Sequence, residues 1–288
     1  MTRVAFDRLS REEPDFQLSP SRSAKDAAGV LARHEAETAA LDRDPSLRVL
    51  RDLAYGAGPR QRMDLCLPAR RGGPAPCLAF IHGGFWQEGS KAGSGFAART
   101  FAEAGWAHAA LGYTLTPEAR LRDIVAEIGA ALSHLRRIAT DHGIDPARIV
   151  LAGHSAGGHL ATAVLAGMAG RQAAQTLAGV VAISGVFDLA PVAASCVNDL
   201  ARLDPAEIAE LSPLLHRPLR DVPLHLLIGA DEPAAFQAQT DALEAAWAPR
   251  LSRLTVHRAP GCDHFDILDR LADPAAPPLA EIRRMAAG

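Results

Sequence analysis

From Arg48 onward the chain alternates short apolar segments with longer amphipathic ones, and this alternation constrains the fold more than any other feature. Short apolar runs are typical of buried strands, and longer segments with apolar residues every three or four positions are typical of helices that cover them. Strands and helices that alternate in this way build a mostly parallel sheet with helices on both faces. The sequence therefore predicts an α/β fold whose mostly parallel sheet has about eight strands.

The first two predicted strands flank a turn that contains Gly56, Gly58 and Pro59, which favours an antiparallel hairpin at the edge of the sheet. The clearest helix is expected to begin at Pro117, because proline suits the first turn of a helix, and to stop at Gly143. The predicted strands cover residues 47–54, 62–67, 77–82, 107–111, 149–152, 180–184, 224–228 and 254–258.

The 288 residues are compatible with one domain or two, because a domain holds roughly 150 residues but a single α/β sheet often runs longer. The beginning of the chain is polar, with Pro14 and a serine-rich stretch, and then shows a short helical pattern through Val30 and Leu41. We therefore expect an N-terminal arm or cap segment over residues 1–45 and a single α/β domain over residues 46–288. The arm is a candidate cap over the pocket.

Composition excludes several classes of protein. Hydrophobic residues make up 48% of the chain and charged residues 22%, which is ordinary for a globular protein with a sizeable core. The net charge of −3 offers no basic surplus for nucleic acid, and no apolar stretch reaches the length of about 18 residues that a membrane span needs. We expect a soluble, cytoplasmic protein whose four scattered cysteines are reduced thiols.

The strongest chemical motif is Gly153-x-Ser155-x-Gly157, which lies between an apolar strand and an alanine-rich helix. A serine forced into a sharp turn from strand to helix exposes its hydroxyl, and glycines two positions away on either side avoid collisions with neighbouring backbone. The positive end of the helix then faces the site. The motif and its context predict that Ser155 is a catalytic nucleophile.

A second motif, His82-Gly83-Gly84-Phe85-Trp86, ends a buried strand about seventy residues before the serine. Acyl transfer places negative charge on the former carbonyl oxygen, and backbone N–H groups held in position stabilise that charge. We expect the N–H groups of Gly84 and Phe85 to form this oxyanion hole together with the N–H of Ala156. Gly83 is expected to shape the turn, and His82 to brace the loop.

A catalytic triad in this order of elements needs an acid and then a histidine after the serine. His264 follows the last predicted strand, at the edge of the sheet where active sites gather, and is the predicted general base. Asp231 and Glu232 follow the strand before it, and only one of them can face His264. Glu232 is preferred, because the acid of such folds usually stands three residues after the strand-ending Gly229, and Asp231 is kept as the alternative acid.

The remaining histidines give no metal motif. His154 and His159 are five positions apart, whereas a helical zinc pair needs a spacing of four and a glutamate after the first histidine. We therefore expect these histidines to be structural, and we expect no metal and no cofactor.

These motifs together resemble the α/β-hydrolase superfamily, and the likeness extends from about Tyr55 to Leu271. Within the superfamily the chain resembles kynurenine formamidases (arylformamidases) and related bacterial esterases. The segments that carry this narrower likeness are 55–56, 60–68, 82–87, 112–117, 153–160, 183–189, 212–213, 229–236 and 263–265. One departure is Glu232, which stands where the family usually has aspartate.

The resemblance implies a serine hydrolase that cleaves the N-formyl amide of N-formyl-L-kynurenine to L-kynurenine and formate, a step of tryptophan degradation. It also implies that Phe85 and Trp86 shape a small acyl pocket and an aromatic leaving-group site. Two alternatives stay open: a carboxylesterase for short acyl esters, and a non-catalytic ligand-binding protein on a hydrolase fold. The expected partner is a small-molecule substrate, with no nucleic acid and no membrane, and a homodimer is left open.

Overall fold

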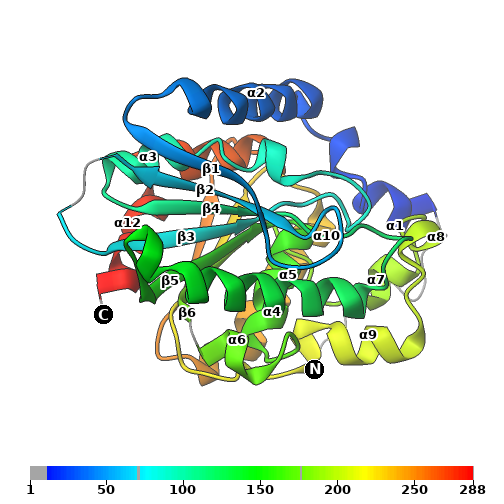
Figure 1. Ribbon diagram of the computed structural model, residues 1–288. Helices are drawn as coiled ribbons and strands as arrows, with labels where there is room; N and C mark the ends of the chain where they lie inside the picture. Colours follow the sequence, from blue (N-terminus) through cyan, green and yellow to red (C-terminus); the bar gives the residue numbers. More distant parts are fainter. Residues whose placement is uncertain (1–11, 70–71, 176, 288) are drawn as a thin grey trace.

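The computed structural model describes residues 12–69, 72–175 and 177–287, and it contains an eight-stranded sheet in the order β1-β2-β4-β3-β5-β6-β7-β8 (Figure 1). β2 pairs antiparallel with β1 and with β4, and the other neighbours are parallel. The predicted α/β fold and the antiparallel edge hairpin are therefore confirmed. The strands are β1 Leu47–Ala54, β2 Arg62–Pro68, β3 Ala75–Ile81, β4 Ala107–Leu111, β5 Ile144–His154, β6 Leu177–Ile183, β7 Leu224–Gly229 and β8 Leu254–Ala259.

Helices cover both faces of the sheet, so the central strands are buried on both sides, and every residue of β4 and β7 is buried. α4, α5 and α10 contribute to the apolar core on one face, and α3 and α12 to the core on the other. The α-helices are α1 Glu12–Gln17, α2 Ala27–Ala40, α3 Ala98–Glu103, α4 Leu121–Ile138, α5 Ala156–Leu165, α6 Arg171–Gln175, α7 Ala190–Ala193, α8 Asn198–Ala201, α9 Pro205–Leu211, α10 Ala234–Trp247, α11 Asp269–Ala272 and α12 Pro277–Ala287. None of the helices in the described ranges is long and apolar enough to cross a membrane.

Helix α4 begins later than the sequence predicts. The prediction placed its start at Pro117, but the first helical residue is Leu121, because the Asp123 carboxylate caps the helix by accepting a hydrogen bond of 3.0 Å from the backbone N of Arg120. The α-helix itself ends at Ile138, before the predicted stop, and the 3-10 turn Thr140–His142 then leads to Gly143, whose φ of 67° is left-handed. Helix starts depend on such caps, which apolar periodicity does not reveal.

The N-terminal segment 12–45 lies against the segments that follow β8. Nη1 and Nη2 of Arg33 in α2 each donate to Asp269 at 2.9 Å, and His34 Nε2 lies 2.8 Å from the same carboxylate. The backbone N of Lys25 donates to Asp263 at 2.8 Å. α2 lies across one face of the molecule (Figure 1), while residues 1–11 of the predicted arm lie outside the described residues.

Candidate active site

Ser155 occupies a sharp turn between β5 and α5. Its φ of 54° and ψ of −115° are unusual for a residue with a side chain and cost of order 1–3 kcal/mol, which the surrounding structure must offset. A Cβ on Gly153 would lie 2.1 Å from the carbonyl oxygen of Gly157, and one on Gly157 would lie 2.2 Å from that of Ile81. The glycines of the motif are therefore required by backbone packing, and this packing holds the strained serine at the end of β5.

His264 and Glu232 form a buried pair beside this turn. His264 Nδ1 lies 2.7 Å from Glu232 Oε2, and their side chains are 2% and 0% exposed. The other carboxylate oxygen, Oε1, accepts hydrogen bonds from Ser184 Oγ at 2.5 Å and from the backbone N of Gly229 at 2.8 Å. These contacts hold the carboxylate in one orientation, and the contact with Nδ1 leaves Nε2 of His264 facing away from Glu232.

Asp231, the alternative acid, points elsewhere. Its side chain is 51% exposed, and its carboxylate lies 3.7 Å from the ammonium group of Lys25. The chain turns at these residues, since the backbone N of Glu232 donates to the carbonyl of Gly229 at 3.3 Å, and the backbone N of Asp231 donates to the carbonyl of Cys262 at 3.0 Å. The structure thus brings Glu232, and not Asp231, to His264, and the alternative is corrected accordingly.

The loop after β3 places backbone N–H groups next to Ser155. Gly84, Phe85 and Trp86 have φ values of 105°, 46° and 62°, a run of left-handed residues that turns the chain sharply. A Cβ on Gly83 would lie 3.0 Å from the Cβ of Ser155, so the loop approaches the serine directly. Within the described residues, no protein acceptor takes the N–H groups of Gly84 and Phe85. Such N–H groups are free to bind an oxyanion.

His82 braces this loop. Its Nδ1 donates to the carbonyl of Gly83 at 2.8 Å, and its ring stacks on that of Tyr113 with centroids 4.2 Å apart. Burial lowers the pKa of His82 to about 4, so the ring is neutral near pH 7 and well suited to this structural contact.

Trp86 lies beneath the loop rather than in the pocket. It is fully buried, its ring packs edge-on against His159 with centroids 5.0 Å apart, and its carbonyl accepts a hydrogen bond from Thr116 N at 2.8 Å. It is not among the residues that line the cavity. The expectation that Trp86 shapes the pocket is therefore wrong, because the left-handed turn at this residue directs its side chain into the core.

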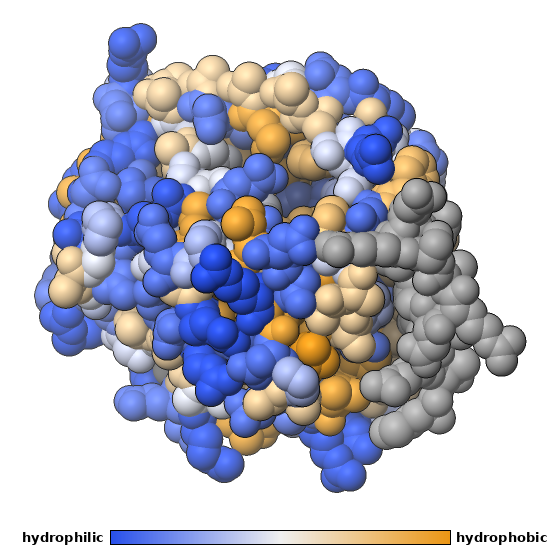
Figure 2. All heavy atoms as spheres, turned by 90° about the vertical axis from the view of Figure 1, so that its right-hand side faces the viewer, coloured by the Kyte–Doolittle hydropathy of each residue, from blue (hydrophilic) through white to orange (hydrophobic). Residues whose placement is uncertain are grey.

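A cavity of about 420 Å³ lies over Ser155 and His264. Figure 2 shows this side of the molecule, where apolar surface lies in a depression among hydrophilic residues. Residues 18–21 and α2 form one wall, and residues 88–96 form another. The described lining residues include no lysine and no arginine. They are Leu18, Ser19, Pro20, Ser21, Leu31, His34, Glu35, Phe80, His82, Gly83, Gly84, Phe85, Glu88, Gly89, Ser90, Gly93, Ser94, Phe96, His154, Ser155, Val197, His264, Phe265 and Leu268.

Two residues support the site in ways that the sequence did not predict. Ser184, which binds Glu232, directly follows β6, and its position at the carboxyl end of a strand was the available signal. His154 Nε2 lies 2.7 Å from the carbonyl oxygen of His264. Burial, with a smaller contribution from His264, keeps the pKa of His154 well below its usual value, so the neutral ring anchors the loop that carries His264.

Comparisons with known proteins find hydrolases and esterases similar to this chain. The BD-FAE family matches residues 63–198. The chain is 26% identical to a kynurenine formamidase of Danio rerio, over 92% of each protein. It is 31% identical to a protein of Silicibacter sp. TM1040 described as a candidate thioesterase, with a TM-score of 0.84 and coverage of 94% of this chain and 99% of that one. Esterase B of Lactobacillus rhamnosis shares the fold, with a TM-score of 0.74 at 23% identity.

Proposed function

This chain belongs to the α/β-hydrolase superfamily, and we propose that it hydrolyses N-formyl-L-kynurenine to L-kynurenine and formate, a step of tryptophan degradation. It is a serine hydrolase; the substrate and the roles of its residues are the proposal. The observation that carries the proposal is the cavity in which Ser155, His264 and the loop after β3 meet. The likeness to a kynurenine formamidase over most of the chain supports the choice of substrate.

In the proposed reaction the hydroxyl of Ser155 attacks the N-formyl carbonyl, and His264 takes the hydroxyl proton. The negative charge that forms on the carbonyl oxygen binds the N–H groups of Gly84, Phe85 and Ala156. His264 then protonates the leaving arylamine, and the formyl group remains on the serine. Water hydrolyses this ester in the second half of the reaction, with His264 again as the base and Glu232 holding its ring.

The cavity suits an aromatic leaving group. Phe85, Phe96 and Phe265 are among its lining residues, and aromatic rings pack favourably on one another. The serine and histidine lie in the same lining, so an aniline that packs on these rings would have its formyl group close to the nucleophile.

The first test is the loss of formanilide absorbance when purified protein is mixed with N-formyl-L-kynurenine. We expect turnover by the wild-type protein and a loss of about 10⁴-fold or more in kcat for Ser155→Ala, because the serine forms the covalent intermediate. Circular dichroism of the variant checks that it is folded. Hydrolysis of simple esters without any hydrolysis of N-formyl-L-kynurenine would refute the proposed substrate.

A second candidate is a carboxylesterase that acts on short acyl esters. The absence of lysine and arginine from the described cavity lining favours it, because N-formyl-L-kynurenine carries a carboxylate that would find no cation there. Comparison of kcat/KM for p-nitrophenyl acetate and N-formyl-L-kynurenine separates the two candidates. If Ser155→Ala leaves every activity unchanged, both fail and the non-catalytic alternative gains support.

A further inference from the structure

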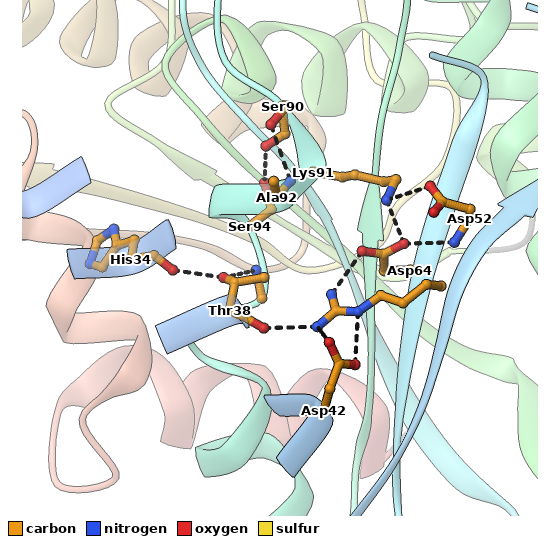
Figure 3. Close-up of polar contacts among 11 residues, drawn as sticks. His34, Thr38, Asp42, Asp52, Asp64, Ser90, Lys91, Ala92 and Ser94 are labelled. Atoms are coloured by element: carbon orange, nitrogen blue, oxygen red, sulfur yellow. Dashed lines mark hydrogen bonds and ion pairs between the residues drawn. The ribbon is translucent and has the colours of Figure 1, made fainter. Parts of the chain in front are cut away.

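Asp64 of β2 is a buried carboxylate for which the proposed chemistry has no use. Its side chain is only 3% exposed. Oδ2 accepts a hydrogen bond from Arg51 Nη1 at 2.8 Å, and Oδ1 accepts from Lys91 Nζ at 2.6 Å and from the backbone N of Asp52 at 2.9 Å (Figure 3). Burying a charge is costly unless partners surround it, and here two cations and an N–H group do so. These three donors hold the Asp64 carboxylate in place, although it has no part in the proposed chemistry.

The backbone of β1 is irregular where it contacts the cluster. The pairing of β1 with β2 shifts register between Leu50 and Leu53, and Asp52 inside this irregularity has a φ of 56°. A residue with a side chain keeps such a conformation only where its surroundings hold it. The distortion brings the N–H of Asp52 to Asp64, and the carboxylate of Asp52 lies 2.8 Å from Lys91 Nζ.

Lys91 connects the cluster to the cavity wall formed by residues 88–96. It begins the 3-10 helix Lys91–Gly93, and Ser90, Gly93 and Ser94 around it all line the cavity. Its ammonium group bridges the carboxylates of Asp52 and Asp64. The cluster therefore holds this wall against the β1-β2 hairpin.

Arg51 connects the cluster to the cavity wall formed by α2. Its Nη2 donates to the carbonyl oxygen of Thr38, near the end of α2, at 2.8 Å. Thr38 Oγ1 in turn accepts from the backbone N of Gly95 at 3.0 Å and donates to the carbonyl of His34 at 2.7 Å, as Figure 3 shows in part. Since α2 carries Leu31, His34 and Glu35 of the cavity lining, both walls are tied to one carboxylate.

We propose that Asp64 is a positioning residue that sets the substrate-size selectivity of the cavity by fixing the spacing between α2 and residues 90–96. This inference rests on the proposed hydrolysis at Ser155. The groups assigned to the chemical step follow other strands, since Ser155 comes after β5, Glu232 after β7 and His264 after β8. Loosening the walls should therefore change which substrates fit and leave the chemical step intact.

The experiment compares Asp64→Asn with wild type on p-nitrophenyl acetate and p-nitrophenyl octanoate. We expect the ratio of the two kcat/KM values to move about tenfold toward one, since a fitted pocket discriminates 10-fold or more for each methylene group. We expect kcat for the acetate to stay within about twofold, because Asp64 does not touch the reacting atoms. A merely structural role would lower both activities in the same proportion.

The matched control is Asp145→Asn. Asp145 also accepts hydrogen bonds from an arginine and a backbone N–H group, namely Arg148 Nε and Ala147 N, both at 2.9 Å. It stands at the start of β5, at the opposite end of that strand from Ser155. We expect this variant to keep the wild-type ratio.

Two milder variants keep the test decisive if Asp64→Asn fails to fold. Thr38→Val removes the hydroxyl that links α2 to Gly95. Lys91→Gln releases only the wall formed by residues 88–96. Each variant is expected to shift the ratio of the two kcat/KM values toward one, as Asp64→Asn does. Lys91→Arg, which keeps the ion pairs, should restore the wild-type ratio. Folded variants with an unchanged ratio overturn this inference alone, whereas no Ser155-dependent hydrolysis by the wild-type protein overturns the proposed function and this inference with it.

Discussion

At the scale of single residues, two adjacent acids have opposite surroundings. Glu232 is enclosed by Ser184, Gly229 and His264, whereas Asp231 is half exposed and lies 3.7 Å from the ammonium group of Lys25. A carboxylate orients a histidine ring only by direct contact, so one residue along the chain separates a candidate catalytic group from a surface charge. Residue type alone could not distinguish them.

We predict that Glu232→Gln lowers kcat by about 10³–10⁴-fold, because an amide N–H facing Nδ1 of His264 would impose the wrong tautomer on the ring. Asp231→Asn, its neighbour and matched control, should keep kcat within about twofold, as expected for an exposed ion pair. Steady-state kinetics on the preferred substrate measure both. An equal loss in the two variants would contradict the assignment of the acid.

At the scale of elements, the turn from β5 to α5 depends on close backbone contacts. α5 can start directly after Ser155 only because Gly157 lets the helix approach the carbonyl of Ile81 in β3. The loop after β3 approaches the same turn through Gly83. β3 and β5 are neighbouring parallel strands, so the nucleophile and the candidate oxyanion loop meet at one edge of the sheet.

Gly157→Ala should lower the free energy of unfolding by at least about 3 kcal/mol, the upper end of typical overpacking, because its Cβ would meet a backbone oxygen that cannot move away. Urea denaturation measures the change. Gly72→Ala is the control, since a Cβ at Gly72 meets nothing within 4 Å. A Gly157→Ala protein as stable as this control would show that the turn can relax.

At the scale of the whole molecule, the cavity is completed by segments from both ends of the chain. α2 reaches the segment after β8 through Arg33 and His34, which share the carboxylate of Asp269 in α11. Burial raises the pKa of Asp269, but the hydrogen bonds from His34 and Arg33 outweigh it and lower the pKa to about 2. The charged form of Asp269 is thus the one that binds α2.

A group whose pKa is lower in the folded protein stabilises it above the ordinary value of 3.8 and loses that effect as the pH falls toward the folded value. We predict that wild type melts at a higher temperature than Asp269→Asn at pH 6, and that this difference shrinks from pH 4 downward. Thermal melts across this pH range test it. A difference that does not vary with pH would mean that the charge of Asp269 is not what binds the arm.

Much of the fold could be predicted because its signals are local. Apolar runs of strand length, the glycines around Ser155 and the glycines after β3 each reflect geometry within a few residues, and the structure places all of them at the predicted elements. The start of α4 was misplaced at Pro117 because the cap formed by Asp123 depends on one side chain rather than on periodicity.

By itself the sequence determined the α/β sheet, its antiparallel edge and the sharp turn at Ser155, because backbone conformation and apolar periodicity act between near neighbours in the chain. Only the tertiary structure decided that Glu232 rather than Asp231 meets His264, that Trp86 is buried beneath its loop, and that the arm lines the cavity. These outcomes depend on burial and on contacts between segments far apart in the chain, which arise only when the sheet has brought those segments together.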